Sequence, residues 1–119
     1  MTPEIDKEGS FVIYEERIYK IVPGKMPDIM ARFTNHALPL FEKHGIKLVG
    51  FWQTAIGPSS NELVYFVAYD DLGHREKAWN AFMNDPAWIE AKAKSEQNGM
   101  LVADVANRIL TPTAFSPLQ

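Results

Sequence analysis

The segment GIKLVGFWQT, residues 45–54, places two large aromatic residues, Phe51 and Trp52, side by side in a predicted β-strand. Neighbouring side chains on a strand point to opposite faces of the sheet, so these two rings cannot enter the same core. The segment ELVYFVAYD, residues 62–70, is also apolar and aromatic at both sets of alternate positions. We therefore expect a sheet that needs cover on both of its faces.

Turn signals divide the rest of the chain into further predicted elements. Besides residues 47–56 and 62–70, strands are predicted over residues 11–21 and 101–110, where β-branched and aromatic residues concentrate. The cluster GPSSN between residues 47–56 and residues 62–70 suits a hairpin loop, so these two strands should pair antiparallel.

Helices are predicted in the two remaining stretches. Apolar residues from residue 25 to 44 share one helical stripe, with a kink expected near Pro39 and a left-handed cap at Gly45. Asp71 can cap a second helix, and Asp85-Pro86 restarts a further short one. The resulting order is β-α-β-β-α-β, the ferredoxin-like motif with a four-stranded antiparallel sheet, and the fold class is α+β.

Two helices cover only one face of such a sheet. At 119 residues the chain fits one domain, predicted over residues 11–119 after a flexible tail at residues 1–10. Because no element is left to cover the second face, we expect a homodimer packed sheet to sheet, or an assembly of such dimers. Either Phe51 or Trp52 should meet the partner.

Composition excludes several classes of protein. The chain has no cysteine, which removes thiolate catalysis, disulfides and cysteine-based metal sites. Its net charge of −3 argues against nucleic-acid binding, and no apolar run reaches the ~20 residues of a membrane helix. The polar, acidic start is not a signal peptide, so we expect a cytoplasmic protein without membrane partners.

Four stretches resemble the NIPSNAP family: YEERIYKIVPGKM, HALPLFEKHGIKLVGFWQT, HREKAWNAFMNDPAW and NRILTPTAFSP. The resemblance covers the chain from Phe11 to Pro117. The resemblance implies a dimeric α+β barrel, an architecture shared with cofactor-independent monooxygenases and haem-degrading enzymes.

The first predicted strand carries charges on both faces. Glu15, Arg17 and Tyr19 share one face, and Tyr14 and Glu16 the other. Charges in a central strand must be paired, solvated or functional. One interpretation is structural ion pairs, Glu15 with Arg17 or Glu16 with a residue of the fourth strand, Arg108. The other is the polar floor of a pocket, in which Arg17 binds an anion.

The candidate site residues follow from these patterns. The catalytic candidates are Arg17, Tyr19 and His44, a histidine on the apolar stripe that could instead interact with the helix end. No metal is predicted, because the three histidines lack ligand spacing, and no cofactor is predicted, because phosphate-binding loops are absent. The ligand-binding candidates are Tyr14, Glu15, Trp52, Tyr65 and Arg108.

Three classes of function fit the sequence. The first is an enzyme acting without a cofactor on a small apolar or aromatic molecule held between sheet and helices. The second is a non-catalytic module that binds a ligand or a protein. The third, an RNA-recognition domain, is the weakest, because the basic residue and glycine that should precede the aromatics of residues 62–70 are missing.

Overall fold

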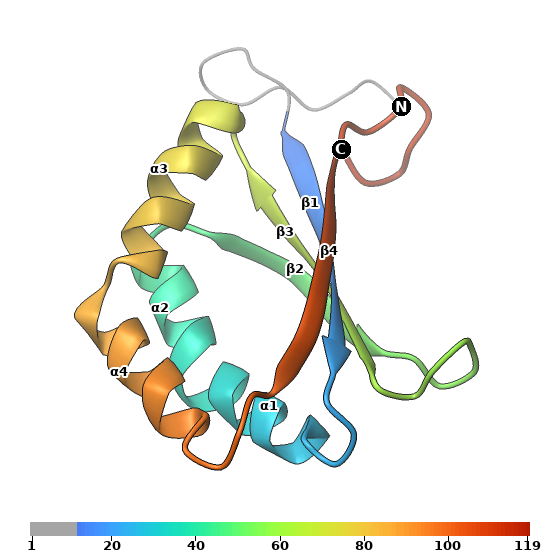
Figure 1. Cartoon of the computed structure of the whole chain (residues 1–119). Helices are drawn as coiled ribbons and strands as arrows, with labels where there is room; N and C mark the ends of the chain where they lie inside the picture. Colours follow the sequence, from blue (N-terminus) through green and yellow to red (C-terminus); the bar gives the residue numbers. More distant parts are fainter. Residues whose placement is uncertain (1–11) are drawn as a thin grey trace.

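The computed structural model describes residues 12–119, so the predicted tail at residues 1–10 lies outside the described residues. Four strands form one antiparallel sheet in the order β2-β3-β1-β4, and all the described helices lie against one of its faces (Figure 1). This arrangement confirms the ferredoxin-like α+β fold. The strands are β1 (Ile13–Ile21), β2 (Lys47–Gln53), β3 (Glu62–Tyr69) and β4 (Val102–Leu110).

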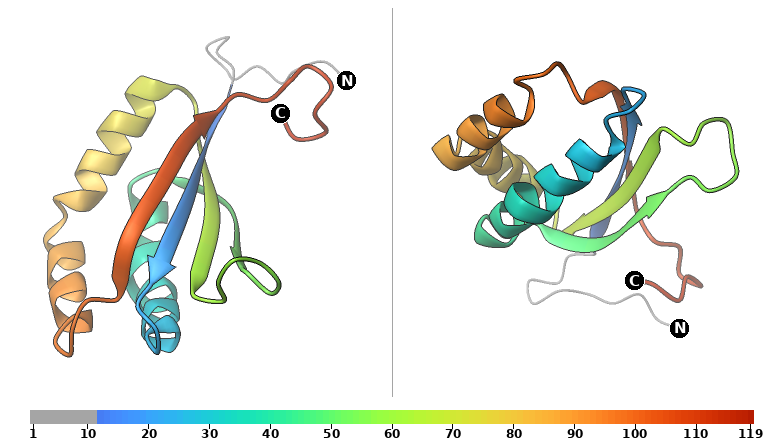
Figure 2. Two further views of the ribbon diagram at one scale, coloured as in Figure 1. Left: turned by 45° about the vertical axis from the view of Figure 1, so that its right-hand side comes forward. Right: turned by 90° about the horizontal axis from the view of Figure 1, so that it is seen from below.

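The helical layer consists of two antiparallel arms, visible from below in Figure 2. The first arm is one continuous rod with a π-helical segment in its middle, and the second consists of two helices that meet at Asp85. The helical elements are α1 (Met26–Arg32), η1 (Phe33–Ala37), α2 (Leu38–Lys43), α3 (Leu72–Met83) and α4 (Pro86–Ser95).

The irregularity predicted near Pro39 takes the form of the π-helical segment η1. Proline cannot donate to the carbonyl four residues earlier, and its ring crowds that carbonyl. The chain adapts just before Pro39, where the Leu38 amide donates to the carbonyl of Phe33, five residues back. The rod ends as predicted at Gly45, whose φ of +74° lies in the left-handed region.

The strand containing Phe51 and Trp52 is shorter than predicted. It ends at Gln53 rather than at residue 56, because the following loop turns away from the sheet and leaves Ile56 99% exposed. Within the strand, Phe51 faces the helices and stacks on Tyr65, with ring centroids 4.4 Å apart. Trp52 lies on the opposite face, where it is 55% exposed and makes a T-shaped ring contact with Phe66.

The core therefore lies between the sheet and the helices. Its central layer is aromatic: Phe33 and Phe41 from the first arm pack on Tyr65, and Phe82 packs between Phe41 and Trp88. The second sheet face has no covering layer in the described part of the chain (Figure 2). We call this face, with Trp52, Phe66, Val64, Ile18 and the Glu16–Arg108 pair, the open face.

Candidate functional site

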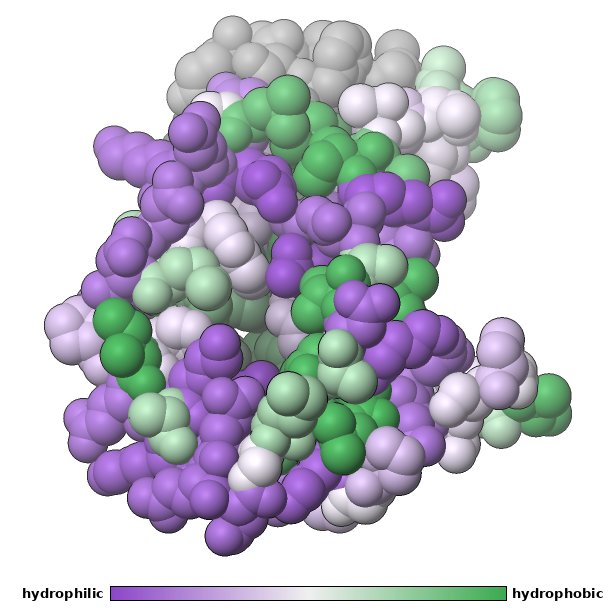
Figure 3. Space-filling view, in the orientation of Figure 1, coloured by the Kyte–Doolittle hydropathy of each residue, from purple (hydrophilic) through white to green (hydrophobic). Residues whose placement is uncertain are grey.

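A cavity of about 350 Å³ lies between the sheet and the helical arms. It opens beside the edge strand β4, and Figure 3 shows the hollow between that strand and helices α3 and α4. Its walls combine aromatic rings with charged groups from β1, α1 and α4. The lining residues used below are Arg17, Tyr19, Arg32, Phe33, Phe41, Trp79, Phe82, Trp88, Lys92, Glu96 and Asp104.

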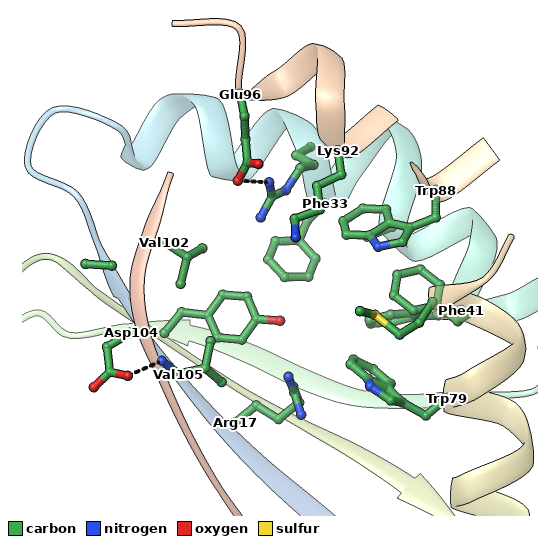
Figure 4. Close-up of a pocket in the computed structure, with 16 residues that line it drawn as sticks. Arg17, Phe33, Phe41, Trp79, Trp88, Lys92, Glu96, Val102, Asp104 and Val105 are labelled. Carbon is green, nitrogen blue, oxygen red and sulfur yellow. Dashed lines mark hydrogen bonds and ion pairs between the residues drawn. The ribbon is translucent and has the colours of Figure 1, made fainter. Parts of the chain in front are cut away.

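Arg17 forms the floor of this cavity. Strand alternation directs its side chain from β1 towards the helices, where the guanidinium lies 4.4 Å from the centre of the Trp79 ring (Figure 4). Its Nε donates to the hydroxyl of Tyr65 at 2.8 Å, and its Nη1 donates to Glu15 at 2.8 Å. Its Nη2 makes no hydrogen bond with any described residue, which leaves donors available at the cavity floor.

Glu15 is the carboxylate that anchors the floor, and its side chain is fully buried. It accepts four hydrogen bonds of 2.8–3.0 Å: one from Arg17, two from Arg75 on α3 and one from Asn107 on β4. Burial alone would raise the pKa of Glu15, but these donors outweigh it and hold the pKa below its ordinary value. Since two arginines surround one carboxylate, the cluster carries a net charge of +1.

Two tyrosines extend this polar floor. The hydroxyls of Tyr19 and Tyr65 are 2.8 Å apart, and Tyr65 also accepts the Nε–H of Arg17. Burial raises the pKa of Tyr65 well above its ordinary value, so this hydroxyl is neutral at pH 7. Burial lowers the pKa of Arg17, but Tyr65, Tyr19 and Glu15 raise it by more, so the guanidinium stays charged. The floor is thus a permanent cation with the neutral Tyr65 hydroxyl beside it.

Neither a metal centre nor a membrane segment is found among residues 12–119. No group of three or more histidine, cysteine, aspartate or glutamate side chains is arranged to hold a metal ion there. Within the same residues, every helix is too short or too polar to cross a membrane. What the cavity offers chemically is hydrogen bonding, positive charge and aromatic surface.

Comparison with known proteins places the chain in a family. The family model described as NIPSNAP matches residues 14–117. The chain belongs to the NIPSNAP family. This NIPSNAP chain is 32% identical to Protein NipSnap homolog 3A of Homo sapiens over 79 residues, which are 66% of the chain and 31% of that relative. It is 29% identical to Protein NipSnap of Drosophila melanogaster, over 98% of the chain and 41% of the relative. It thus spans less than half the length of these curated relatives.

Solved NIPSNAP structures have the same fold as this chain. A NIPSNAP family protein from Agrobacterium tumefaciens is 30% identical, with a TM-score of 0.81 over 91% of this chain and 99% of that one. An uncharacterized NIPSNAP-like domain protein from Burkholderia xenovorans is 31% identical, with a TM-score of 0.78 and 89% of each chain covered. These neighbours confirm the family and the architecture.

The structure brings some of the predicted site residues of this NIPSNAP domain together. Arg17 and Tyr19 line the cavity, and Glu15 and Tyr65 lie directly beneath them. His44 does not join them. It lies at the end of α2, where its Nε2 is 2.7 Å from Asp85, the residue that caps α4. Its position matches the helix-end alternative rather than a place in a pocket.

The remaining predicted ligand-binding residues lie on the open face, away from the cavity. Trp52 is exposed there, and Arg108 pairs with Glu16 at 2.7 Å. The Tyr14 hydroxyl donates to the main-chain carbonyl of Gln119 near the C-terminus. These three residues were grouped with the site because both faces of the strands are aromatic, and the sequence alone did not show which face the helices cover.

Several cavity residues were not predicted from the sequence. Arg32 and Lys92 project into the cavity from α1 and α4, and neither they nor Asn107 were singled out. A signal exists for Arg75, which shares a helical stripe with Trp79; this position suits either a charged group that reaches into a cavity or a side chain that extends over that ring. Arg75 instead reaches the sheet and binds Glu15 through two hydrogen bonds.

Proposed function

We propose that this NIPSNAP protein binds a small aromatic molecule carrying an anionic group, held in the cavity between sheet and helices. The observation that carries the proposal is Arg17. Its guanidinium is almost buried, it belongs to a cluster with a net positive charge, and its Nη2 has no hydrogen-bond partner among the described residues. A carboxylate, phenolate or enolate bound there would complete the guanidinium's hydrogen bonds.

The walls above Arg17 support the aromatic part of the proposal. Trp79, Phe33 and Phe82 line the cavity, and their rings belong to the continuous aromatic core. Flat apolar ligands bind well to such walls because ring contacts add to the burial of apolar area. Phe33, Phe41 and Trp79 lie along the sides of the cavity, with Arg17 at its lower end in Figure 4.

The test is calorimetric titration with two probes that share one ring system, one carrying an anionic group and the other a neutral one. We expect 2-naphthoate to bind at least ~10-fold more tightly than neutral 2-naphthalenemethanol, which is about the value of one charge-assisted hydrogen bond. Arg17→Met should abolish this difference. Lys77→Met removes one positive charge from an exposed part of α3 and should leave both affinities unchanged. Equal affinities for the two probes in the wild-type protein would overturn the proposal.

The same residues favour a catalytic version of this function, cofactor-independent oxygenation of a phenol or enol. Arg17 and the Tyr19 hydroxyl could stabilise the substrate oxyanion, and that anion would itself supply the four electrons that reduce O₂. One oxygen atom would enter the ring as a quinone carbonyl, and the other would leave as water. Oxygen consumption with a hydroquinone, compared between the wild-type protein and Arg17→Met, tests it. A rate equal to that of the buffer alone would leave the protein as a binding module.

We also propose that the protein is a homodimer formed through the open face. Trp52 is 55% exposed and Phe66 lies beside it, so a large apolar surface of the sheet remains uncovered by the described chain. Light scattering at micromolar concentration should give twice the chain mass of 13.5 kDa, or a higher even multiple. A monomer mass would contradict this assembly.

A further inference from the structure

The end of the cavity away from the sheet carries a second group of cations. Arg32 ends α1 and Lys92 lies on α4, and both line the same cavity as Arg17. In Figure 4, Lys92 on α4 and Glu96, the residue that follows this helix, lie on one side of the cavity, opposite Arg17 on the sheet side. Phe33 and Trp88 lie on the same side as Lys92. The cavity therefore has a charged group at each end and aromatic walls between them.

Arg32 is poorly satisfied by the protein. Its side chain is 5% exposed, and its Nε is buried without a hydrogen-bond partner among the described residues. Its Nη1 makes only two long contacts, at 3.3 Å to the Ser95 hydroxyl and 3.5 Å to Glu96. A buried guanidinium normally has its donors paired at close to 2.9 Å. The Arg32 guanidinium instead lies 5.4 Å from the centre of the Trp88 ring, a cation–π contact, while its contact with the Glu96 carboxylate is long.

Lys92 adds a second positive charge at the same end. Among residues 12–119 its side chain has no ion pair or hydrogen bond, and it extends into the cavity in Figure 4. Glu96 is the only carboxylate that lines this end among the described residues, so Arg32 and Lys92 exceed it by one charge. The other lining carboxylate, Asp104, lies on β4 and accepts a hydrogen bond from the adjacent amide of Val105.

We infer that the natural ligand is a dianion, an aromatic or otherwise flat apolar molecule with an acidic group at each end. One acid binds Arg17, and the second binds Lys92 and Arg32. This inference rests on the proposed function, because it assigns the first acid to Arg17. Two separated cationic groups, each with donors the protein leaves unused, match two acids better than one.

The experiment extends the calorimetric titration to naphthalene-2,6-dicarboxylate, which adds a second acid to 2-naphthoate across the same ring system. The dicarboxylate should bind the wild-type protein at least ~10-fold more tightly than 2-naphthoate. Lys92→Met should abolish this preference while leaving 2-naphthoate affinity unchanged, whereas Arg17→Met should weaken both probes. Lys94→Met, two residues along the same helix and outside this cavity, is the matched control and should change neither affinity.

The outcomes separate the two levels of the proposal. If 2-naphthoate binds through Arg17 but the dicarboxylate binds no more tightly, the dianion is wrong and the proposed function stands. If neither acid binds, both fail together. Lys92→Glu provides a second test at an exposed position that does not risk the core. It should weaken dicarboxylate binding below that of 2-naphthoate, and an unchanged preference would overturn the assignment of the second acid.

Discussion

Two neighbouring glutamates on β1 have opposite surroundings. Glu15 points towards the helices, is fully buried, and accepts four hydrogen bonds from three side chains. Glu16 points to the open face and makes one ion pair with Arg108, whose side chain is 67% exposed. Each face of this sheet thus carries a Glu–Arg pair, but only the helix-covered pair lies in a closed environment.

The difference shows how the covering helices give one pair a second role. On the helix-covered face, α3 supplies Arg75 as an additional partner for Glu15, and this leaves the Arg17 donors partly unused beside a cavity. On the open face no element of the described chain adds a partner. The structural alternative drawn from the sequence is seen in this cluster as the Glu15–Arg17 ion pair, and the anion-binding alternative stays a prediction.

The largest expected effect comes from placing a carboxylate on each face of β2. Phe51→Asp should cost at least ~3–5 kcal/mol, because it removes a ring stacked on buried Tyr65 and puts a charge in the core. Trp52→Asp should leave the protomer folded and break the proposed dimer. Circular dichroism reports folding, and light scattering reports mass. If Trp52→Asp unfolds the chain as readily as Phe51→Asp, Trp52 contributes to the core of the protomer, and the open face is not a free surface.

The next largest loss of stability is expected when the charge of each glutamate is removed in turn. Glu15→Gln should lower the free energy of unfolding by roughly 3–5 kcal/mol, because two arginines near the core then lack a counter-charge. Glu16→Gln removes one half of a pair whose arginine is 67% exposed, although the Glu16 side chain is 14% exposed, and should cost less than about 1 kcal/mol. Urea denaturation of both variants measures the difference. A large loss for Glu16→Gln would reveal that an assembly buries the open-face pair.

The sequence predicted the order of elements and the ion pairs because these depend on local patterns. Alternating apolar residues identified the strands, and charges two residues apart on β1 had to lie on one face, as Glu15 and Arg17 do. The Glu16–Arg108 pair was also confirmed. The direction of Phe51 was not predictable, because both faces of β2 are apolar and a register shift interrupts its pairing between Leu48 and Gly50.

His44 shows the limit of a helical wheel. The predicted stripe continues through the π-helical segment η1, since Phe33, Ala37 and Phe41 are all buried in the core. The His44 side chain is also only 15% exposed, but a wheel does not indicate which group on another helix it meets. That group is Asp85, at the start of α4. The cavity cations Arg32 and Lys92 depend on how the two helical arms pack, which no pattern within one helix could indicate.

A smaller loss of stability is expected at acidic pH. The pKa of folded Glu15 lies below its ordinary value of about 4.3, so the carboxylate stabilises the fold above that pH and loses this contribution as the pH falls through the folded pKa. The free energy of unfolding should therefore decrease in acid. Glu15→Gln should show a weaker decrease than the wild type over the same range, which urea denaturation at several pH values measures. Parallel curves would contradict the lowered pKa.

Arg17→Met should have a much smaller effect on folding than Glu15→Gln. Methionine keeps much of the packing against Trp79, the desolvation of a guanidinium is relieved, and Glu15 retains three of its four hydrogen bonds through Arg75 and Asn107. We expect a loss of no more than about 1–2 kcal/mol, against the larger loss for Glu15→Gln. Thermal or urea unfolding measures it. A loss of stability as large as that of Glu15→Gln would mean that Arg17 is needed for folding. A stable Arg17→Met variant that no longer binds 2-naphthoate would instead assign Arg17 to ligand binding. In that case Glu15 and Arg75 are the ion pair that holds β1 to α3.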